Sequence, residues 1–106
     1  MKGSASKKGQ YLSESQLTRQ IRALLDAFGI FHWKQWQGPM SHPRGISDII
    51  GIYQGRFLAI EVKTPKGKLT DSQRAFIQRV NREGGIAFVA RSVEDVIKHL
   101  GLKTLI

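Results

Sequence analysis

The amino-acid sequence predicts a small α/β domain with a central mixed four-stranded sheet flanked by helices on both faces. Apolar runs of strand length occupy residues 46–53, 57–62 and 86–90, and the aromatic-rich segment 30–36 alternates loosely, as a strand does. Three other segments repeat apolar residues at helical spacing. The predicted order is α, β, β, β, α, β, α, and the helix between the third and fourth strands permits a right-handed parallel crossover.

Length and composition limit the classes of protein to consider. A chain of 106 residues suits one domain, which we place at residues 11–106, after a disordered basic arm at residues 1–10. The 17 Lys and Arg against 8 Asp and Glu give a net charge of +9, which favours a polyanionic partner such as nucleic acid over a merely soluble basic protein.

The absence of two sequence features restricts chemistry and location. No cysteine is present, so a metal would have to be held by oxygen or imidazole ligands. No apolar run approaches the ~20 residues of a membrane span, and the N-terminus lacks the apolar segment of a secretory signal. We therefore expect an intracellular protein without a membrane partner.

The first helix is predicted to begin at Ser13 and to end near Phe28, before Gly29. The Ser-x-x-Gln spacing from Ser13 to Gln16 fits a capping box. At about 100° per residue, Glu14 lies in line with the apolar stripe of this helix, so its carboxylate points toward the core side. Glu14 is either a functional carboxylate or a first-turn acid that complements the helix dipole.

The segment after the strand at residues 30–36 is a loop, residues 37–44, because it holds two of the three prolines. His42 and Arg44 in this loop are candidate contacts for nucleic acid, and a solvated loop is the alternative interpretation. The apolar runs 46–53 and 57–62 then form a hairpin through the turn Gln54-Gly55.

The hairpin contains Asp48, Glu61 and Lys63, three charged residues in otherwise apolar strands. Because side chains alternate across a strand, Glu61 and Lys63 share one face while Val62 points to the other. The turn folds the second strand back, so Asp48 approaches Glu61 across the ladder. Charges in such strands are generally paired, bind a metal or do chemistry.

A basic turn at residues 64–68, with Lys66 and Lys68, leads to a second helix capped by Thr70. Gln73 extends the apolar stripe of this helix toward the sheet, and Arg74 lies on its outer face. Lys66, Lys68 and Arg74 are further candidate contacts for a nucleic-acid backbone, although an outer-face arginine is most simply a solvated side chain. Gly84-Gly85 ends the helix, residues 86–90 form a buried strand, and Ser92 caps a last helix that ends before Gly101.

Phosphodiester hydrolysis requires neutralised phosphate charge, an activated water and help for the leaving oxygen. Two close carboxylates attract a hard divalent cation, and a lysine beside them can hold or help deprotonate the attacking water. The alternative is a buried ion pair of Glu61 and Lys63 with Asp48 as a cap. That alternative does not explain why Glu14 and Gln73 also lie on inward-facing stripes.

These motifs resemble the PD-(D/E)-x-K nuclease superfamily, whose restriction-endonuclease-like core has the order αβββαβ. More narrowly, they resemble its virus-type replication-repair nuclease family, VRR-NUC, which has stand-alone phage and bacterial members. The likeness rests on a Gly-x-x-Asp approach to a hairpin, a Glu-Val-Lys strand end, a preceding Glu-bearing helix and a following Gln-bearing helix. It covers residues 14–96, and its motifs lie at residues 45–48, 60–65 and 69–73.

The resemblance implies that Asp48 and Glu61 bind Mg²⁺ or Mn²⁺, with the main-chain carbonyl of Val62 as another ligand. It implies that Lys63 is the catalytic lysine. Glu14 would be the helix carboxylate and a further ligand or water holder, and Gln73 would lie near the scissile strand. One departure is Ser47, which stands where the family usually has proline and which affects loop geometry rather than ligation.

The sequence therefore predicts a metal-dependent DNA endonuclease, and the resemblance implies a homodimer acting on branched DNA such as four-way junctions. Two other interpretations remain open at this point. The chain is either a non-catalytic basic nucleic-acid-binding module or a nuclease of the same fold with another substrate, such as a restriction-type or RNA endonuclease.

Overall fold

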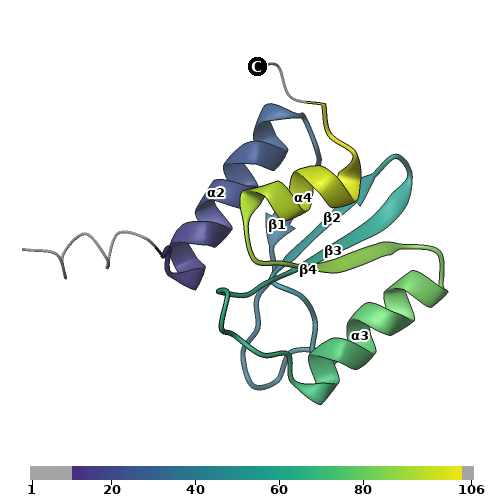
Figure 1. The fold of residues 1–106 in the computed structure, drawn as a ribbon. Helices are drawn as coiled ribbons and strands as arrows, with labels where there is room; N and C mark the ends of the chain where they lie inside the picture. The colour runs from purple at the N-terminus through teal and green to yellow at the C-terminus, as the bar shows by residue number, and fades with distance from the viewer. Residues whose placement is uncertain (1–10, 104–106) are drawn as a thin grey trace, which may run out of the picture.

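The computed structural model describes residues 11–103, so the basic arm predicted at residues 1–10 and the last residues 104–106 lie outside the described chain. Within residues 11–103, seven elements follow one another in the predicted order (Figure 1). They are helix α2 (Glu14–Ala27), strands β1 (His32–Lys34), β2 (Ile49–Tyr53) and β3 (Arg56–Val62), helix α3 (Asp71–Arg82), strand β4 (Ile86–Ala90) and helix α4 (Val93–Leu100).

The strands form one mixed sheet in the order β1-β2-β3-β4. The pairs β1–β2 and β2–β3 are antiparallel, and β3–β4 is parallel, which confirms the predicted crossover through α3. The predicted hairpin turn is also present, and both of its residues have positive φ, 51° at Gln54 and 79° at Gly55. Positive φ at both central positions matches the right-handed twist of the flanking strands.

Strand β1 is shorter than the predicted strand at residues 30–36. The N–H of Ile30 donates 2.9 Å to the carbonyl of Leu25, so this residue completes the end of α2 instead of joining the sheet. Strand β2 likewise begins at Ile49 because the N–H of Ile46 closes a turn onto Pro43 at 3.2 Å. Both differences concern strand ends, where turn hydrogen bonds replace ladder pairs.

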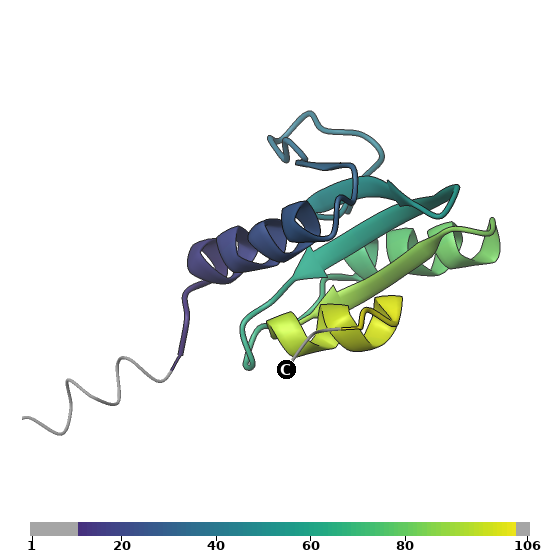
Figure 2. The ribbon, with the colours of Figure 1, turned by 90° about the horizontal axis from the view of Figure 1, so that it is seen from above.

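Helices cover both faces of the sheet, as predicted (Figure 2). On one face α2 and α4 pack together over β3 and β4, around a core that includes Ile21, Leu58 and Val96. On the other face α3 packs on β3 and β4, where Ile50, Ala59 and Ala87 meet its partly buried apolar residues Phe76, Ile77 and Val80. The side chains of Phe31, Trp33, Ile52 and Phe57 are exposed.

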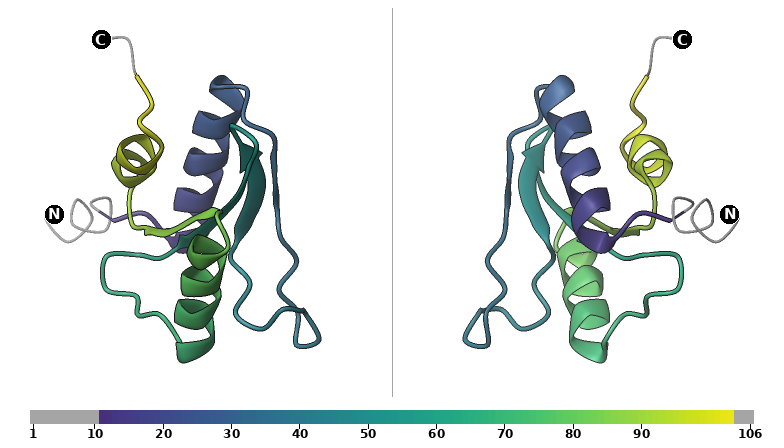
Figure 3. Two further views of the ribbon diagram at one scale, coloured as in Figure 1. Left: turned by 90° about the vertical axis from the view of Figure 1, so that its right-hand side faces the viewer. Right: turned by 90° about the vertical axis from the view of Figure 1, so that its left-hand side faces the viewer.

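Two loops meet the first turn of α3. The loop between β1 and β2 and the segment between β3 and α3 both run down to this end of the helix (Figure 3). Gly45 has φ 74°, and a Cβ at this position would lie 2.2 Å from the carbonyl oxygen of Ser72. Only glycine allows so close a backbone contact, and that contact fixes the loop that leads to Asp48.

Within residues 11–103, no helix is long and apolar enough to cross a membrane.

Candidate active site

Asp48 and Glu61 face each other at the end of the antiparallel ladder. Ile49 pairs with Ile60 in the β2–β3 register, so one further step along the ladder brings Asp48 opposite Glu61. Asp48 is 9% exposed and Glu61 is 2% exposed. The two carboxylates, one directly before β2 and one near the end of β3, are thus buried side by side, as the hairpin pattern predicted.

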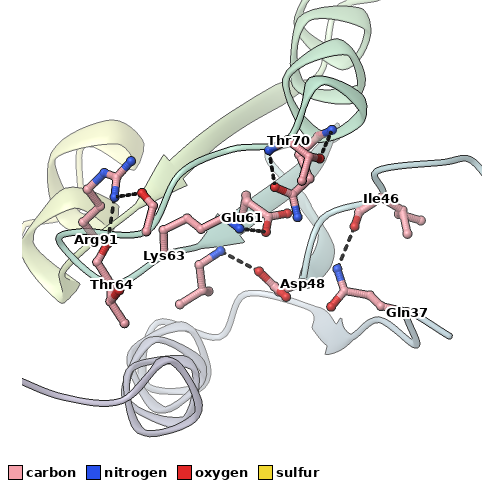
Figure 4. Close-up of polar contacts among 11 residues, drawn as sticks. Gln37, Ile46, Asp48, Glu61, Lys63, Thr64, Thr70 and Arg91 are labelled. Atoms are coloured by element: carbon pink, nitrogen blue, oxygen red, sulfur yellow. Dashed lines mark hydrogen bonds and ion pairs between the residues drawn. The ribbon is translucent and has the colours of Figure 1, made fainter. Parts of the chain in front are cut away.

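The Asp48 carboxylate also extends the ladder. Its Oδ2 atom accepts a 2.6 Å hydrogen bond from the backbone N–H of Val62, a position that a backbone carbonyl would otherwise fill (Figure 4). The Val62 side chain is fully buried in the core formed with α2 and α4. Glu61 is two residues after Ala59 in the strand, so its side chain lies on the same face as Ala59, the α3 side of the sheet. This hydrogen bond holds Asp48 against the strand that carries Glu61.

Burial, together with repulsion from the neighbouring Asp48 carboxylate, raises the pKa of Glu61 to about 9, and burial is the larger of these two causes. Lys63 acts in the opposite direction, since its Nζ lies 3.8 Å from Glu61 Oε2 and its side chain is only 14% exposed. The lowering of the Glu61 pKa by Lys63 is smaller than the combined increase caused by burial and the Asp48 carboxylate. In the protein alone, Glu61 therefore holds a proton at neutral pH.

The carboxylates and the lysine fit a divalent cation. The Glu61 Oε1 atom is buried and has no hydrogen-bond partner among the described residues, which is costly unless something else occupies that position. A cation between Asp48 and Glu61 would satisfy this oxygen and remove the repulsion. Within residues 11–103, no three Asp, Glu, His or Cys side chains cluster tightly enough to hold an ion. The remaining ligands would therefore be water, phosphate oxygens or the Val62 carbonyl, a set that Mg²⁺ accepts.

Glu14 lies in a cleft of about 280 Å³ together with Asp48. Its charge contributes to the raised pKa of Glu61, although it is the smallest of the contributions. Because Glu14 does not complete a three-carboxylate group, a role as direct ligand is less well supported than a role in holding water.

The same cleft is lined by Arg19, Arg22 and Lys34, which the sequence interpretation did not single out. The Nε atom of Arg22 is buried and has no hydrogen-bond partner among the described residues. Helical spacing was the signal that was available, because Arg22 follows Glu14 by two i, i+4 steps on α2. These cations make the edge of the acidic cleft suitable for phosphate.

Gln73 lies at the first turn of α3, and its side chain completes the predicted capping box. Its Oε1 accepts a 2.9 Å hydrogen bond from the N–H of Thr70, and its own N–H donates 3.1 Å to the Thr70 hydroxyl. Gln73 lines a neighbouring hollow with Gly45 and Gln37, and Gln37 also borders the Asp48 cleft. Gln37 is held there by a 2.7 Å hydrogen bond from its Nε2 to the carbonyl of Ile46. The structure thus brings Gln73 near the site but not into the cleft of Asp48.

The other predicted nucleic-acid contacts are exposed. Their positions are His42 and Arg44 in the β1–β2 loop, Lys66 and Lys68 after β3, and Arg74 on α3. Arg74 lies 3.5 Å from Asp71 in an exposed i, i+3 pair. Exposure is compatible with phosphate contacts and equally with solvation, so these assignments stay predictions.

Ser47 precedes Asp48 and is fully buried. Its hydroxyl has no hydrogen-bond partner among the described residues. The hydroxyl is therefore not used to shape the approach to Asp48.

The αβββαβ order, the mixed sheet and the acid pair beside a lysine define a restriction-endonuclease-like core. The sequence matches the VRR-NUC domain over residues 5–94, which is most of the chain. The protein therefore belongs to the VRR-NUC family of the PD-(D/E)XK nuclease superfamily. It is also similar to Holliday junction resolvase RecU of Mycoplasmopsis pulmonis (strain UAB CTIP), with 33% identity over 64 residues. That similarity covers 55% of this chain and 41% of the relative, so the chain spans about two fifths of the relative's length.

Proposed function

We propose that this protein is a metal-dependent DNA endonuclease that acts on branched DNA such as four-way junctions. The observation that carries the proposal is the buried pair Asp48 and Glu61 beside Lys63, in a chain of a nuclease family. The similarity to a relative named as a Holliday junction resolvase supports branched DNA as the substrate.

Asp48 and Glu61 would hold Mg²⁺ or Mn²⁺, with the Val62 carbonyl as a third protein ligand. When bound, the ion supplies charge neutralisation at the phosphate and a more acidic water. Lys63 projects toward Glu61 (Figure 4). In the proposed reaction it would orient the attacking water and stabilise developing negative charge. Glu14 and Gln37 line the same cleft as Asp48 and would hold water or substrate there.

The cations of the cleft support a path for the DNA strand. Arg19, Arg22 and Lys34 line the cleft that contains Asp48, so a phosphate next to the scissile one would meet them. The predicted contacts His42, Arg44, Lys66, Lys68 and Arg74 are exposed and would add further phosphate contacts outside the cleft.

A homodimer is part of the proposal, because a four-way junction requires paired cuts. An exposed apolar face on the sheet supports it. Trp33 pairs with Ile50 in β1–β2, and Ile52 pairs with Phe57 in β2–β3, so these side chains share the α3 side of the sheet. Trp33, Ile52 and Phe57 remain 41%, 50% and 44% exposed, and Phe31 adds a ring 5.7 Å from that of Trp33. A second copy is the occupant that we propose for this apolar face.

Cleavage assays with a four-way junction, a flap, plain duplex DNA and structured RNA, each with Mg²⁺ or Mn²⁺, test the proposed activity. We expect metal-dependent nicking with preference for the junction. Lys63→Ala should abolish cleavage while leaving folding and DNA binding nearly intact, because Lys63 acts on the water. Lys98→Ala, an exposed substitution on α4, is the matched control and should cleave normally. Undiminished cleavage by Lys63→Ala, or cleavage in EDTA, would refute the assignment.

A further inference from the structure

Arg91 lies directly beside the segment that carries Lys63. It follows the last residue of β4, and in the parallel β3–β4 register Val62 is the partner of Ala90. The N–H of Lys63 donates 3.1 Å to the carbonyl of Ala90, which continues the ladder by one step. The Arg91 backbone therefore lies next to the end of β3, the strand that leads into Lys63.

The Arg91 guanidinium holds the turn after Lys63. Its Nη1 atom donates to the carbonyls of Thr64 and Gly67, both at 2.7 Å, and more weakly to Pro65 at 3.4 Å (Figure 4). The backbone N–H of Arg91 donates 2.8 Å to Asp95 on α4, which anchors Arg91 itself. Hydrogen bonds from a charged donor to backbone carbonyls are stronger than neutral ones, so the turn at residues 64–67 has a fixed shape.

The turn at residues 64–67 packs on the Lys63 side chain. The N–H of Gly67 donates 3.0 Å to Thr64, which folds the turn back toward the end of β3. A Cβ on Gly67 would lie 3.3 Å from Cδ of Lys63, so the Gly67 backbone lies close against the aliphatic part of this side chain. A free lysine side chain has many rotamers, and contact along its length reduces them.

We propose that Arg91 is a positioning residue for Lys63, acting through the turn at residues 64–67. The inference rests on the proposed function only for its consequence in catalysis. The structural link from the Arg91 guanidinium through Thr64 and Gly67 to the Lys63 side chain is independent of the activity. The alternative is that the Arg91 hydrogen bonds only stabilise the fold and do not affect the position of Lys63.

Arg56 offers a matched control for that alternative. Its Nε donates 2.9 Å to the carbonyl of Gly84 and its Nη2 donates 3.1 Å to that of Gly85. Like Arg91, it ties backbone carbonyls to the sheet, but it lies at the first residue of β3, at the opposite end of the strand from Lys63. Arg91→Met and Arg56→Met both keep an unbranched side chain and remove the donors.

The first measurement is NMR of protein with ¹³Cε-labelled lysine, with the Lys63 signal assigned by its loss in Lys63→Arg. In the unmodified protein we expect two inequivalent Hε protons at shifts distinct from those of exposed lysines. In Arg91→Met the two should merge and move to the exposed-lysine position, whereas Arg56→Met should leave them unchanged. Arg91→Lys, which keeps a charge and fewer donors, should fold and shift the signals part of the way.

The second measurement is cleavage kinetics. Arg91→Met should lower kcat roughly 10- to 100-fold with little change in KM, because a misplaced catalytic group slows chemistry rather than binding. Unmoved Lys63 signals in both Arg91 variants, or equal signal changes in Arg56→Met, would overturn the proposal. If the unmodified protein proved not to cleave DNA, the proposed function would fail, and the NMR comparison alone would still decide the role of Arg91.

Discussion

Asp48 lies opposite Glu61 at the end of the β2–β3 ladder, and burial together with the Asp48 carboxylate raises the pKa of Glu61 to about 9. The ordinary value for a glutamate is 4.5, so the folded protein binds this proton far more tightly than the unfolded chain does. The stabilising effect of that proton is fully present below pH 4.5 and is lost as the pH rises through about 9. Stability of the metal-free protein should therefore fall across this window.

This pH dependence should disappear in Glu61→Gln, because glutamine stays neutral at every pH. Urea unfolding in EDTA at pH 5, 7 and 9 should show the variant gaining stability relative to the unmodified protein as the pH rises. Glu94→Gln, an exposed substitution on α4, should follow the unmodified protein. Parallel stability curves for Glu61→Gln and the unmodified protein would contradict this account of the buried pair.

Metal binding should release a proton at pH 7, because an ion between Asp48 and Glu61 favours the ionised form of both carboxylates. Titration of Mn²⁺ by calorimetry in two buffers with different ionisation enthalpies measures the number of protons released, and we expect about one. Asp48→Asn should weaken binding, and Glu61→Gln should abolish the release. Binding of equal affinity in Asp48→Asn would place the ion elsewhere.

Arg22 should contribute one phosphate contact from the cleft. Replacing it with glutamine removes one charge that neutralises phosphate, so the slope of log K against log salt for junction binding in EDTA should fall by about 1. Arg82→Gln, at the far end of α3, is the control for net charge alone. Equal slopes for the two variants would show that Arg22 acts only as part of a general positive field.

The exposed apolar face should be the site of dimerisation. Ile52→Lys introduces a charge among Trp33, Phe57 and Phe31 and should convert dimers to monomers in sedimentation experiments without changing the helical circular dichroism signal. Phe28→Lys, at an exposed apolar residue that ends α2, should leave the mass unchanged. A monomeric unmodified protein, or a dimeric Ile52→Lys variant, would remove the support for this face.

The residues of the site differ in how well the sequence located them. Alternation along a strand is strict, so it placed Glu61 beside Lys63 and across from Asp48 correctly. The positions on the helices were predicted only from the angle of each residue around the helix axis. This angle does not say how close a helical side chain comes to a given residue of the sheet. Glu14 therefore reaches the cleft without joining the carboxylate pair, and Arg22 in the same line on α2 was overlooked.

Contacts made through the backbone were the hardest to foresee. The three carbonyls held by Arg91 and the close approach of Gly45 to Ser72 depend on loop geometry, which no periodic pattern records. A signal for Arg91 did exist, since a cation directly after a buried strand lies beside Lys63 once β3 and β4 are parallel. Using that signal required the register, which only the structure supplies.

Gln73 has two possible roles, as a cap of α3 and as a contact to the scissile strand, and two substitutions distinguish them. Its side chain closes the capping box with Thr70, so Gln73→Ala removes one hydrogen bond and should reduce the free energy of unfolding by about 1 kcal/mol. Gln73→Glu retains an acceptor for the Thr70 N–H and should restore that stability. If Gln73 only caps α3, Gln73→Glu should cleave DNA like the unmodified protein. If its amide also contacts the scissile strand, as the family resemblance implies, Gln73→Glu should be stable and yet slow, because it adds a negative charge near phosphate. Thermal unfolding and junction cleavage measured on the same two variants separate these outcomes.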